Sequence, residues 1–369
     1  MYIHQRKGWP RVSWESEVLT TPLAAVRHKQ GHLLGQMEAL GFDQRTEASL
    51  VAMTSEVVKS SAIEGEQLDP AQVRSSIARR LGLDAAGLPK AGRDVEGIVE
   101  VLLDATQKHE SPLTSERLYQ WHKSLFPEGR EQFGPITVGA WRTDEKGPMQ
   151  VVSGAMGKEV VHFEAPEASR LKAEMDRFLG WFNTPSQDDP LLRAGLAHLW
   201  FVTIHPFDDG NGRIARAIAD MALARADGTK DRFYSMSSQI AAERKDYYRK
   251  LESTQRGDLD ITAWLEWFLG CLDRSITSAN QSLRVVLRKA RFWQRISRHP
   301  INDRQRKVLN LMLNGFEGFL STSKYAKLAP CSPDTALRDI RELLDLGVLE
   351  QNAGGGRNTS YRLVDALME

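Results

Sequence analysis

The feature that most constrains this 369-residue chain is a strongly apolar segment that runs directly into a dozen polar residues. Residues 189–204, DPLLRAGLAHLWFVTI, have the composition of a buried helix, and Asp189 is a suitable N-cap. The helical segment before it, SRLKAEMDRFLGWFN, has Ser169 as its predicted N-cap. Residues 205–216 then read HPFDDGNGRIAR, and a second helical pattern, RIARAIADMALARADG, begins within them. Pro206 lacks the N–H that would continue the first helix. The sequence therefore predicts a buried helix, a polar turn and a second helix.

The turn itself has the parts of an anion-binding site. Gly210, Asn211 and Gly212 tolerate positive φ, so the backbone can turn there and aim successive N–H groups at one point. The free amides and the positive dipole end of the next helix face the same point. Arg213 and Arg216 are three residues apart, so both can reach a phosphate bound there.

Two other side chains of the turn add chemistry to anion binding. Asp209 is a hard oxygen ligand beside the expected phosphate site, where Mg²⁺ is commonly held together with phosphate oxygens. His205 precedes the turn and is a candidate general base near neutral pH. An ordinary helix–loop–helix corner would explain GNG alone, but it explains the whole string poorly. The residues thus predict a phosphoryl- or nucleotidyl-transfer site, and the sequence has no GxxxxGK[ST] motif that would offer a P-loop instead.

The string HPFDDGNGRIAR resembles the full signature of the Fic (Fic/Doc) family, HxFx(D/E)GNGRxxR, at every fixed position, and the wider resemblance covers most of residues 1–290. Members of that family mostly transfer AMP from ATP to a Ser, Thr or Tyr hydroxyl of a protein. For this chain the resemblance implies that His205 deprotonates the target hydroxyl. It also implies that Asp209 holds Mg²⁺ on the α- and β-phosphates.

The resemblance assigns the rest of the turn as well. It implies that Gly210, Asn211 and Gly212 form the anion hole. It implies that Arg213 grips the phosphates and that Arg216 binds the γ-phosphate. The branch of the family that phosphorylates its targets typically has a lysine in place of the second glycine, so the glycine at 212 favours AMP transfer.

A Gly-rich segment at 139–167, with Val pairs on both sides of SGAMGKE, predicts a β-hairpin. It resembles the flap of the family, whose exposed edge would pair with a target segment. The candidates for contact with the substrate or nucleotide are Val160, Val161, His162 and Phe163. An ordinary surface hairpin is the open alternative.

The segment ERKDYYRKLESTQRGDLD resembles the part of the family that contacts the nucleotide. The resemblance implies that Tyr247 and Gln255, eight residues apart and on one helix face, lie toward the adenosine. Packing of Tyr247 and Tyr248 in the core is the alternative. His198, seven residues before His205, is expected to be a hydrogen-bonded core histidine rather than half of a zinc site.

An earlier helical segment, 47–65, ends in SSAIEG, which fits the inhibitory motif of the family, (S/T)xxxE(G/N). Ser60 and Glu64 lie on one helix face, and Gly65 stands where the helix would end. The resemblance implies that Glu64 pairs with Arg216 and places negative charge where the γ-phosphate should lie. Glu64 as a solvated residue at a helix end is the alternative.

The composition changes near residue 295, and the rest of the chain predicts a separate module. Residues 300–369 read as helix, short helix, helix and a hairpin around GGGR, the order of a winged helix-turn-helix. They hold nine Lys/Arg and nine Asp/Glu. The expected recognition helix, SPDTALRDIRELLDLG, carries the acidic residues Asp334, Asp339, Glu342 and Asp345. Although Arg338, Arg341 and Arg357 offer a local basic face, this is a poor match to DNA, so we favour a packing, dimerising or target-docking module.

The bulk composition sets the remaining expectations. The chain has 49 basic and 48 acidic residues, so no strong attraction to nucleic acid or anionic membranes is built into the whole. Cys271 and Cys331 are its two cysteines, which disfavours a disulfide framework or cysteine-built zinc site. The N-terminus lacks the apolar region of a signal peptide, and no apolar run of about 18 residues predicts a membrane span. We expect a cytoplasmic protein.

The interpretation as a whole is a mostly α protein with a Fic helical core, a β-hairpin flap and a C-terminal winged helix. We expect an N-terminal helical region with the inhibitory motif at 1–100, a Fic catalytic domain at 101–294 and the winged helix at 295–369. The expected function is a protein adenylyltransferase that uses ATP and Mg²⁺ and is inhibited by Glu64. Its expected partners are ATP and a protein hydroxyl, with a homodimer suggested by the resemblance alone. Removal of AMP by the same site, and a DNA-binding regulator that senses a nucleotide, are the alternatives.

Overall fold

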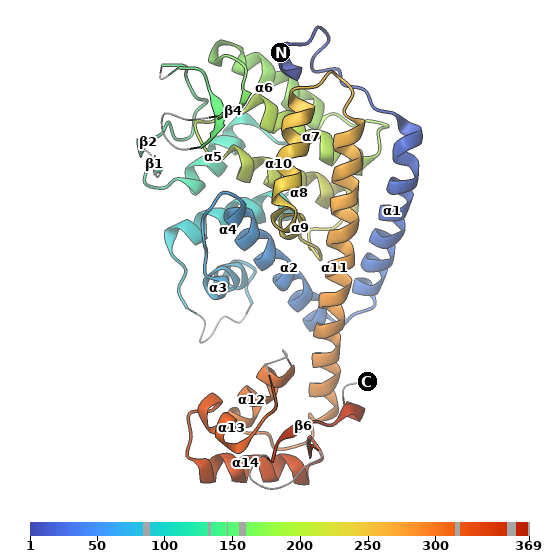
Figure 1. Cartoon of the computed structure of the whole chain (residues 1–369), viewed down its shortest axis with the longest axis vertical. Helices are drawn as coiled ribbons and strands as arrows, with labels where there is room; N and C mark the ends of the chain where they lie inside the picture. Colours follow the sequence, from blue (N-terminus) through green and yellow to red (C-terminus); the bar gives the residue numbers. More distant parts are fainter. Residues whose placement is uncertain are drawn as a thin grey trace. The chain divides into compact units, whose positions relative to one another are not determined.

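The computed structural model describes residues 1–83, 89–131, 134–145, 147–154, 160–313, 318–352 and 359–367. The protein is mostly helical, as the sequence predicts, and its chain divides into two compact units, Met1–Ala279 and Asn280–Glu369 (Figure 1). The division falls inside one long helix, α11 (Thr262–Arg295), whereas the composition places a boundary near residue 295, at the end of that helix.

The first unit contains the short 3-10 turn η1, ten complete helices and two strand pairs among the residues described. The helical elements are η1 (Ile3–Gln5), α1 (Ser16–Glu38), α2 (Phe42–Ile63), α3 (Pro70–Arg80), α4 (Arg93–Gln107), α5 (Ser115–Leu125), α6 (Ala168–Asn183), α7 (Pro190–Ile204), α8 (Asn211–Asp227), α9 (Met236–Ala242) and α10 (Arg244–Gln255). The strands are β1 (Arg130–Glu131), β2 (Gly134–Pro135), β3 (Gln150–Ser153) and β4 (Val160–Glu164). Among the helices described, none combines the length and apolar character that crossing a membrane requires.

Helices α7 and α8 form the centre of this unit. Every residue of α7 from Leu191 to Ile204 is buried except Arg193, so α7 is a core helix apolar on all sides. Helix α8 packs along it and carries alanines on much of its surface, which allows neighbouring helices to approach closely. The predicted order of buried helix, polar turn and second helix is confirmed.

The predicted caps of two helices had different outcomes. Asp189 caps α7, because its carboxylate accepts a hydrogen bond of 2.7 Å from the N–H of Leu191. The prediction that Ser169 caps α6 is wrong, because the N-cap is Glu167 and helix α6 begins at Ala168. The N–H of Ala168 instead donates to the carboxylate of Asp144, 2.6 Å away, a residue from a distant loop. Local sequence did not reveal a cap supplied by tertiary structure.

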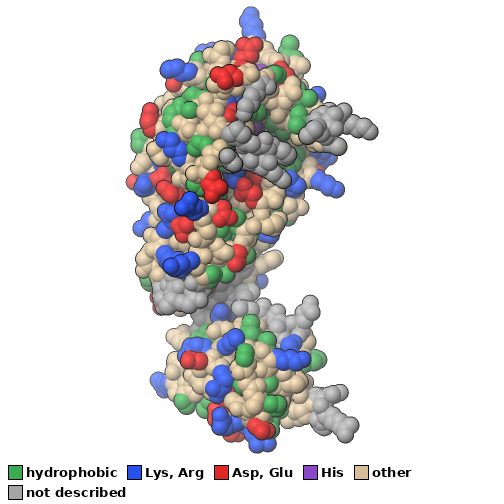
Figure 2. Space-filling view, turned by 90° about the vertical axis from the view of Figure 1, so that its left-hand side faces the viewer, with side chains coloured by type: hydrophobic (Ala, Val, Ile, Leu, Met, Phe, Trp, Pro, Cys, Tyr) green, Lys and Arg blue, Asp and Glu red, His purple; other side chains and the backbone are tan. Residues whose placement is uncertain are grey.

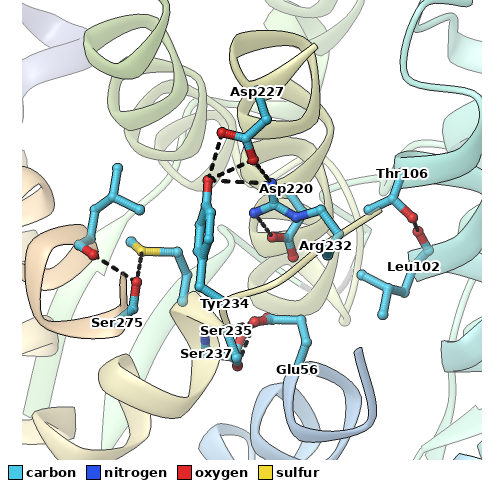
Figure 3. A network of polar contacts seen from close by, with 12 residues as sticks. Glu56, Leu102, Thr106, Asp220, Asp227, Arg232, Tyr234, Ser235, Ser237 and Ser275 are labelled. Atoms are coloured by element: carbon cyan, nitrogen blue, oxygen red, sulfur yellow. Dashed lines mark hydrogen bonds and ion pairs between the residues drawn. The ribbon is translucent and has the colours of Figure 1, made fainter. Parts of the chain in front are cut away.

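A buried polar network joins α2 to α8 and to the segment before α9 (Figure 3). Arg232 forms ion pairs with Asp227 at 2.6 Å and with Asp220 of α8 at 3.2 Å. Glu56 of α2 lies beside Asp220, and its carboxylate accepts bonds from the Ser235 hydroxyl at 2.8 Å and a backbone amide at 3.0 Å. Burial, together with the Glu56 charge, raises the pKa of Asp220 well above its usual range. The network fixes where α2 lies along α8.

The hairpin at 139–167 has its strands where the paired valines predict them. β3 and β4 pair antiparallel, with Gln150 opposite Glu164 and Ser153 opposite Val160, and a bulge interrupts the register between Val151 and Val152. The connecting residues 155–159 lie outside the described part of the chain.

The second unit has its own core. After the end of α11 it contains, in the described residues, α12 (Asp303–Leu313), α13 (Thr322–Leu328), α14 (Pro333–Asp345), β5 (Leu349–Gln351), β6 (Tyr361–Leu363) and the 3-10 turn η2 (Asp365–Leu367). Its helices enclose the apolar side chains of Phe292, Val308, Tyr325, Ile340 and Leu349, among others.

The element order of the second unit is the one predicted for a winged helix. β5 and β6 form an antiparallel hairpin after the third helix, and Leu320 adds an antiparallel bridge to Tyr361. The GGGR turn and Arg357 lie outside the described residues. The winged-helix assignment of this unit stays a prediction.

A close helix contact gives a test of the packing. A Cβ at Gly97 of α4 would lie 1.8 Å from the carbonyl oxygen of Ser124 in α5. We expect Gly97→Ala to lower the free energy of unfolding by about 2 kcal/mol, because the two helices must separate. Gly180→Ala, in the open face of α6, should raise it by about 0.5–1 kcal/mol. Urea unfolding of both variants measures this, and equal effects would contradict it.

Candidate active site

The turn after α7 has an unusual backbone. His205 ends that helix in the left-handed conformation, with φ 51° and ψ 59°, and it is the only residue other than glycine with positive φ among those described. Gly210 has φ 77° at the start of α8. Left-handed backbone costs about 1–2 kcal/mol outside glycine, so the conformation at 205 must be held by its surroundings.

Arg142 supplies that support from the base of the flap. Its Nε donates to the carbonyl oxygen of His205 at 2.8 Å, and its backbone N–H donates to the carbonyl of Pro206 at 2.9 Å. The guanidinium is fully buried, pairs with Asp144 at 2.9 Å and also bonds the carbonyl of Pro166. One buried arginine thus joins both ends of the flap to the turn.

His122 of α5 supports the other side of the turn. The N–H of Gly139 donates to its Nδ1 at 3.1 Å, so Nδ1 is the acceptor and Nε2 carries the proton. Nε2 then donates to the carbonyl oxygen of Asp209 at 3.2 Å. Burial lowers the pKa of His122 to about 4, which keeps the ring neutral. The ring stacks on Phe207, with centroids 4.2 Å apart.

Asn211 closes the turn from within. Its side-chain oxygen accepts from the N–H of Phe207 at 3.0 Å, and its side-chain amide donates to the carbonyl of the same residue at 2.8 Å. The oxygen and the nitrogen of the side-chain amide are therefore both bonded inside the turn. The side chain of Asn211 thus holds the turn in shape.

The start of α8 offers its first amides to a ligand. Gly210 is the N-cap, and no side chain caps this helix end. The first amide bonded back into the helix is that of Ile214, which donates to the carbonyl of Gly210 at 3.0 Å. The three preceding N–H groups and the positive end of the helix dipole point out of the helix, as an anion site requires.

The imidazole of His205 has a defined tautomer. Its Nδ1 lies 3.1 Å from the carbonyl oxygen of Val202, which can only accept, so Nδ1 carries the proton and Nε2 is the basic nitrogen. Burial lowers the pKa of His205 below its ordinary value, against the effect of that bond, and the Arg142 charge lowers it further. Asp209 and Glu64 act on the ring in the opposite direction. The ring is neutral at pH 7 and suited to accept a proton.

Glu64 lies over the start of α8. Its Oε1 forms an ion pair of 2.8 Å with Nη2 of Arg216, which is almost fully buried. A Cβ placed on Gly212 would lie 2.2 Å from the same oxygen. The carboxylate therefore contacts the first turn of α8 as well as the arginine.

Ser60 completes the surroundings of Arg216. The guanidinium Nε donates to the Ser60 hydroxyl and its Nη2 to the Ser60 carbonyl, both at 2.9 Å. Gly65 has φ 92° directly after the helix, as its predicted place at the helix end requires. The structure thus brings Ser60, Glu64 and Arg216 together.

Arg213 lies next to two carboxylates. Its Nη1 is 2.6 Å from Oε1 of Glu66, and its Nη2 is 3.6 Å from Oδ2 of Asp209. Its guanidinium also lies over the ring of Phe126, 4.9 Å from the centroid. The carboxylate of Asp209 is one-third exposed. Among the described residues, no group of three or more His, Cys, Asp and Glu side chains is arranged to hold a metal ion.

The flap residues have partners in α10 and at its C-cap, Arg256. His162 joins the hydroxyl of Ser153, 2.6 Å from its Nε2, to the carboxylate of Glu252, 2.9 Å from its Nδ1. Arg256 donates to the backbone carbonyls of Val161 at 2.7 Å and of His162 at 3.0 Å. Two carbonyls of β4 are therefore already bonded within the protein.

Two side chains of the flap differ sharply in exposure. Val160 is 57% exposed, whereas Phe163 is buried against Tyr2 and His4. Contact with a substrate stays a prediction for the exposed positions of β4.

Tyr247 and Gln255 are both buried. The hydroxyl of Tyr247 lies 2.9 Å from Nε2 of His198, and its ring packs against Trp264 and Trp267. The side-chain amide of Gln255 donates to the Thr203 hydroxyl at 3.2 Å. In this structure both side chains are bonded inside the core, and their contact with adenosine stays a prediction. His198 is the hydrogen-bonded core histidine expected from the sequence.

The same region of the chain is similar to known proteins. Residues 112–223 match the Fic/DOC family, and residues 2–83 match a domain of unknown function, DUF4172. The chain contains a Fic/DOC family domain. This domain includes α5, the flap, α7 and the turn that follows α7, so the residues joined by Arg142 and His122 all lie inside it.

Two relatives bear the name protein adenylyltransferase Fic. The one from Drosophila mojavensis is 28% identical over 226 residues, which are 60% of this chain and 40% of that protein. The one from Culex quinquefasciatus is 28% identical over 232 residues, 61% of this chain and 41% of that protein. The matched part thus spans about two fifths of the length of each relative.

Two solved structures share the fold. A Fic family protein from Desulfovibrio desulfuricans has a TM-score of 0.57 at 19% identity, covering 96% of this chain and 98% of its own. A Fic domain containing signaling protein from Bacteroides thetaiotaomicron has a TM-score of 0.51 at 20% identity, covering 70% of this chain and 97% of its own. These similarities confirm the helical Fic fold.

The motif did not indicate four residues that shape the site. They are His122, Arg142, Glu66 and Arg256. Each acts through backbone carbonyls or one ion pair with a residue far away in sequence, so no local pattern marks them. The only available signal was their position, since Arg142 lies inside the predicted flap segment and Glu66 is two residues after Glu64.

The lowered pKa of His122 predicts that the stability of the protein depends on pH. Its folded pKa is about 4 and its ordinary value 6.5, so the unfolded chain takes up a proton first as the pH falls. This residue should therefore cost about 1.4 kcal/mol per pH unit below 6.5, levelling off near pH 4. In His122→Gln, the free energy of urea unfolding should fall less steeply between pH 6 and 4.5, by about that amount per unit. Identical slopes in both proteins would show that the ring titrates normally.

Proposed function

We propose that this protein transfers AMP from ATP to a hydroxyl group of a protein. The observation that carries the proposal is the segment 205–216, where a neutral imidazole precedes an uncapped helix start that carries two buried arginines. The name of the relatives, protein adenylyltransferase, supports the reaction class.

The chemistry follows from these groups. The oxygen of a target hydroxyl attacks the α-phosphorus of ATP, its proton passes to Nε2 of His205, and pyrophosphate leaves. The backbone amides at the start of α8 and the guanidinium of Arg213 stabilise the negative charge of the phosphates in the transition state. In this assignment Gly210 and Gly212 leave space for the backbone to approach the phosphates.

Asp209 is the residue that would hold Mg²⁺. A single carboxylate suits this ion, which commonly binds one or two protein carboxylates and takes its other ligands from phosphates and water. The side chain is one-third exposed, and its backbone carbonyl is fixed by His122. When bound, Mg²⁺ supplies charge neutralisation at the phosphates.

We further propose that Glu64 inhibits the enzyme. Its carboxylate forms the ion pair with Arg216 and contacts Gly212, so it lies where a terminal phosphate would bind in this assignment. Helix α2 fills the space beside the arginines, and the cavity between α2, α4 and α8 measures only about 10 Å³. That is about the space of one water molecule.

Replacing Glu64 tests the reaction and its inhibition together. Incubated with Mg·ATP, Glu64→Gly should add AMP to protein at least about 100-fold faster than the wild type, because a partly buried ion pair no longer excludes the phosphate. Adding His205→Ala should reduce that rate by about 10²–10⁴-fold. Intact-mass spectrometry of the protein measures both. If neither wild type nor Glu64→Gly adds AMP, while the wild type releases AMP from a modified protein, the site works in the reverse direction.

The charge of the second unit favours DNA binding as a second candidate function. Counted from Asn280, where the unit begins, it holds 15 Lys/Arg and nine Asp/Glu, because residues 280–299 add six basic side chains and no acid. Asp339, one of the acidic residues of the expected recognition helix, is buried and paired with Arg304 at 2.8 Å, and it also accepts from the Tyr325 hydroxyl. Its charge is therefore not presented on the surface of the helix. Arg338 and Arg341 are exposed on α14.

Lys and Arg side chains are spread over the face of this unit that Figure 2 shows. We propose that this unit binds duplex DNA through its phosphates, with α14 as the helix that enters the groove.

DNA binding is measured with the full chain. Fluorescence anisotropy with a 30-base-pair duplex should show affinity falling about 100-fold between 50 and 200 mM salt, as about four phosphate contacts imply. Arg338→Ala with Arg341→Ala should weaken binding about tenfold. Removing two exposed charges of the first unit, Lys172→Ala with Arg249→Ala, should not. Salt-independent binding, or equal loss in both double variants, would contradict the proposal.

A further inference from the structure

Glu66 is a second carboxylate at the arginines of α8. Its Oε1 lies 2.6 Å from Nη1 of Arg213, closer than the 2.8 Å between Glu64 and Arg216. The side chain of Arg213 is 5% exposed, whereas that of Glu66 is 47% exposed. A buried guanidinium is thus paired with a carboxylate that reaches it from the surface. The inhibitory pattern (S/T)xxxE(G/N) does not include this position.

One backbone motif places both carboxylates. Helix α2 ends with Glu64 as its C-cap, followed by Gly65 at φ 92°. The N–H of Gly65 donates to the carbonyl of Ala62 and the N–H of Glu66 to that of Ser61, both at 3.1 Å. These are the two bonds of a Schellman motif, which fixes the residues on either side of the glycine relative to the helix. Glu64 and Glu66 are therefore presented to α8 as a pair.

The two pairs divide the arginines between them. Glu64 bonds Arg216, and Glu66 bonds Arg213. The other carboxylate near Arg213 is that of Asp209, 3.6 Å away, which the proposed function reserves for Mg²⁺. Among the described residues the Nε of Arg213 has no partner, so Glu66 makes the closest bond of this guanidinium.

We propose that Glu66 is a second inhibitory residue that withholds Arg213 from the phosphates of the nucleotide while Glu64 withholds Arg216. This inference rests on the proposed function of the same site. A triphosphate needs both guanidinium groups, so it must displace the carboxylates of Glu64 and Glu66. The Schellman motif couples the two residues, so both carboxylates are displaced together. Replacing Glu64 alone leaves Arg213 paired with Glu66, so such a variant is only partly relieved of inhibition.

The first measurement is nucleotide binding, which does not depend on turnover. By calorimetry with Mg²⁺ and a non-hydrolysable ATP analogue, Glu66→Gln should bind about tenfold more tightly than the wild type. Glu64→Gly with Glu66→Gln should bind about tenfold more tightly than Glu64→Gly alone. Glu66→Asp keeps the charge on a shorter side chain and should fall between wild type and Glu66→Gln. Gln is nearly isosteric and keeps an acceptor oxygen for Arg213, so the variant should stay folded, with a lower melting temperature than the wild type because the charge pair is lost.

The second measurement is the rate of AMP addition, read by intact mass. The double variant should exceed Glu64→Gly several-fold. Glu47→Gln is the matched control, because Glu47 lies on α2, the helix that Glu66 follows, and pairs with Arg74 at an equal 2.6 Å, away from the turn. It should leave both binding and rate at their wild-type values.

The outcomes separate this inference from the proposed function. Unchanged analogue affinity in Glu66→Gln overturns the inference, even if Glu64→Gly adds AMP. A lower rate in the double variant than in Glu64→Gly also overturns it, because Glu66 would then orient Arg213 for the reaction. Tighter binding without any AMP addition supports the inference and removes the proposed function.

Discussion

Two arginines buried at the start of α8 need partners, and the rest of this site follows from how α2 supplies them. Arg213 and Arg216 are nearly enclosed, and a buried charge without a partner costs several kcal/mol. The end of α2 provides two carboxylates and a serine at these positions. The carboxylates of α2 and of the residues after it neutralise the buried arginines and so stabilise the packing of α2 on α8. A bound triphosphate would neutralise the same arginines, so one contact can serve both packing and inhibition.

The contact extends along both helices. Arg216 and Asp220 form a stripe on α8 with helical spacing, and Glu56 and Ser60 form the matching stripe on α2. At one end of this helix contact, Arg232 pairs with Asp220, and both side chains are buried, as Figure 3 shows. At the other end, the arginines pair with Glu64 and Glu66, whose carboxylates are partly exposed to water.

Much of this could be predicted from sequence, for identifiable reasons. The order of α7, turn and α8 was predictable because apolar spacing and glycines are local signals. The pairing of Glu64 with Arg216 came from a resemblance rather than from spacing. The roles of His122 and Arg142 were not predictable, because each bonds backbone carbonyls far away in sequence. The cap at Ser169 was wrong for a related reason, since Asp144 arrives from another segment.

The central claim is that the carboxylate of Glu64 occupies the place of a nucleotide phosphate. A crystal structure of Glu64→Gly with Mg²⁺ and a non-hydrolysable ATP analogue tests it most directly. We expect the terminal phosphate against Arg216 and the amides of α8, with Nε2 of His205 facing the α-phosphate. A nucleotide bound elsewhere, or the turn at 205–213 empty with Arg216 still bonded to Ser60 alone, would contradict the claim.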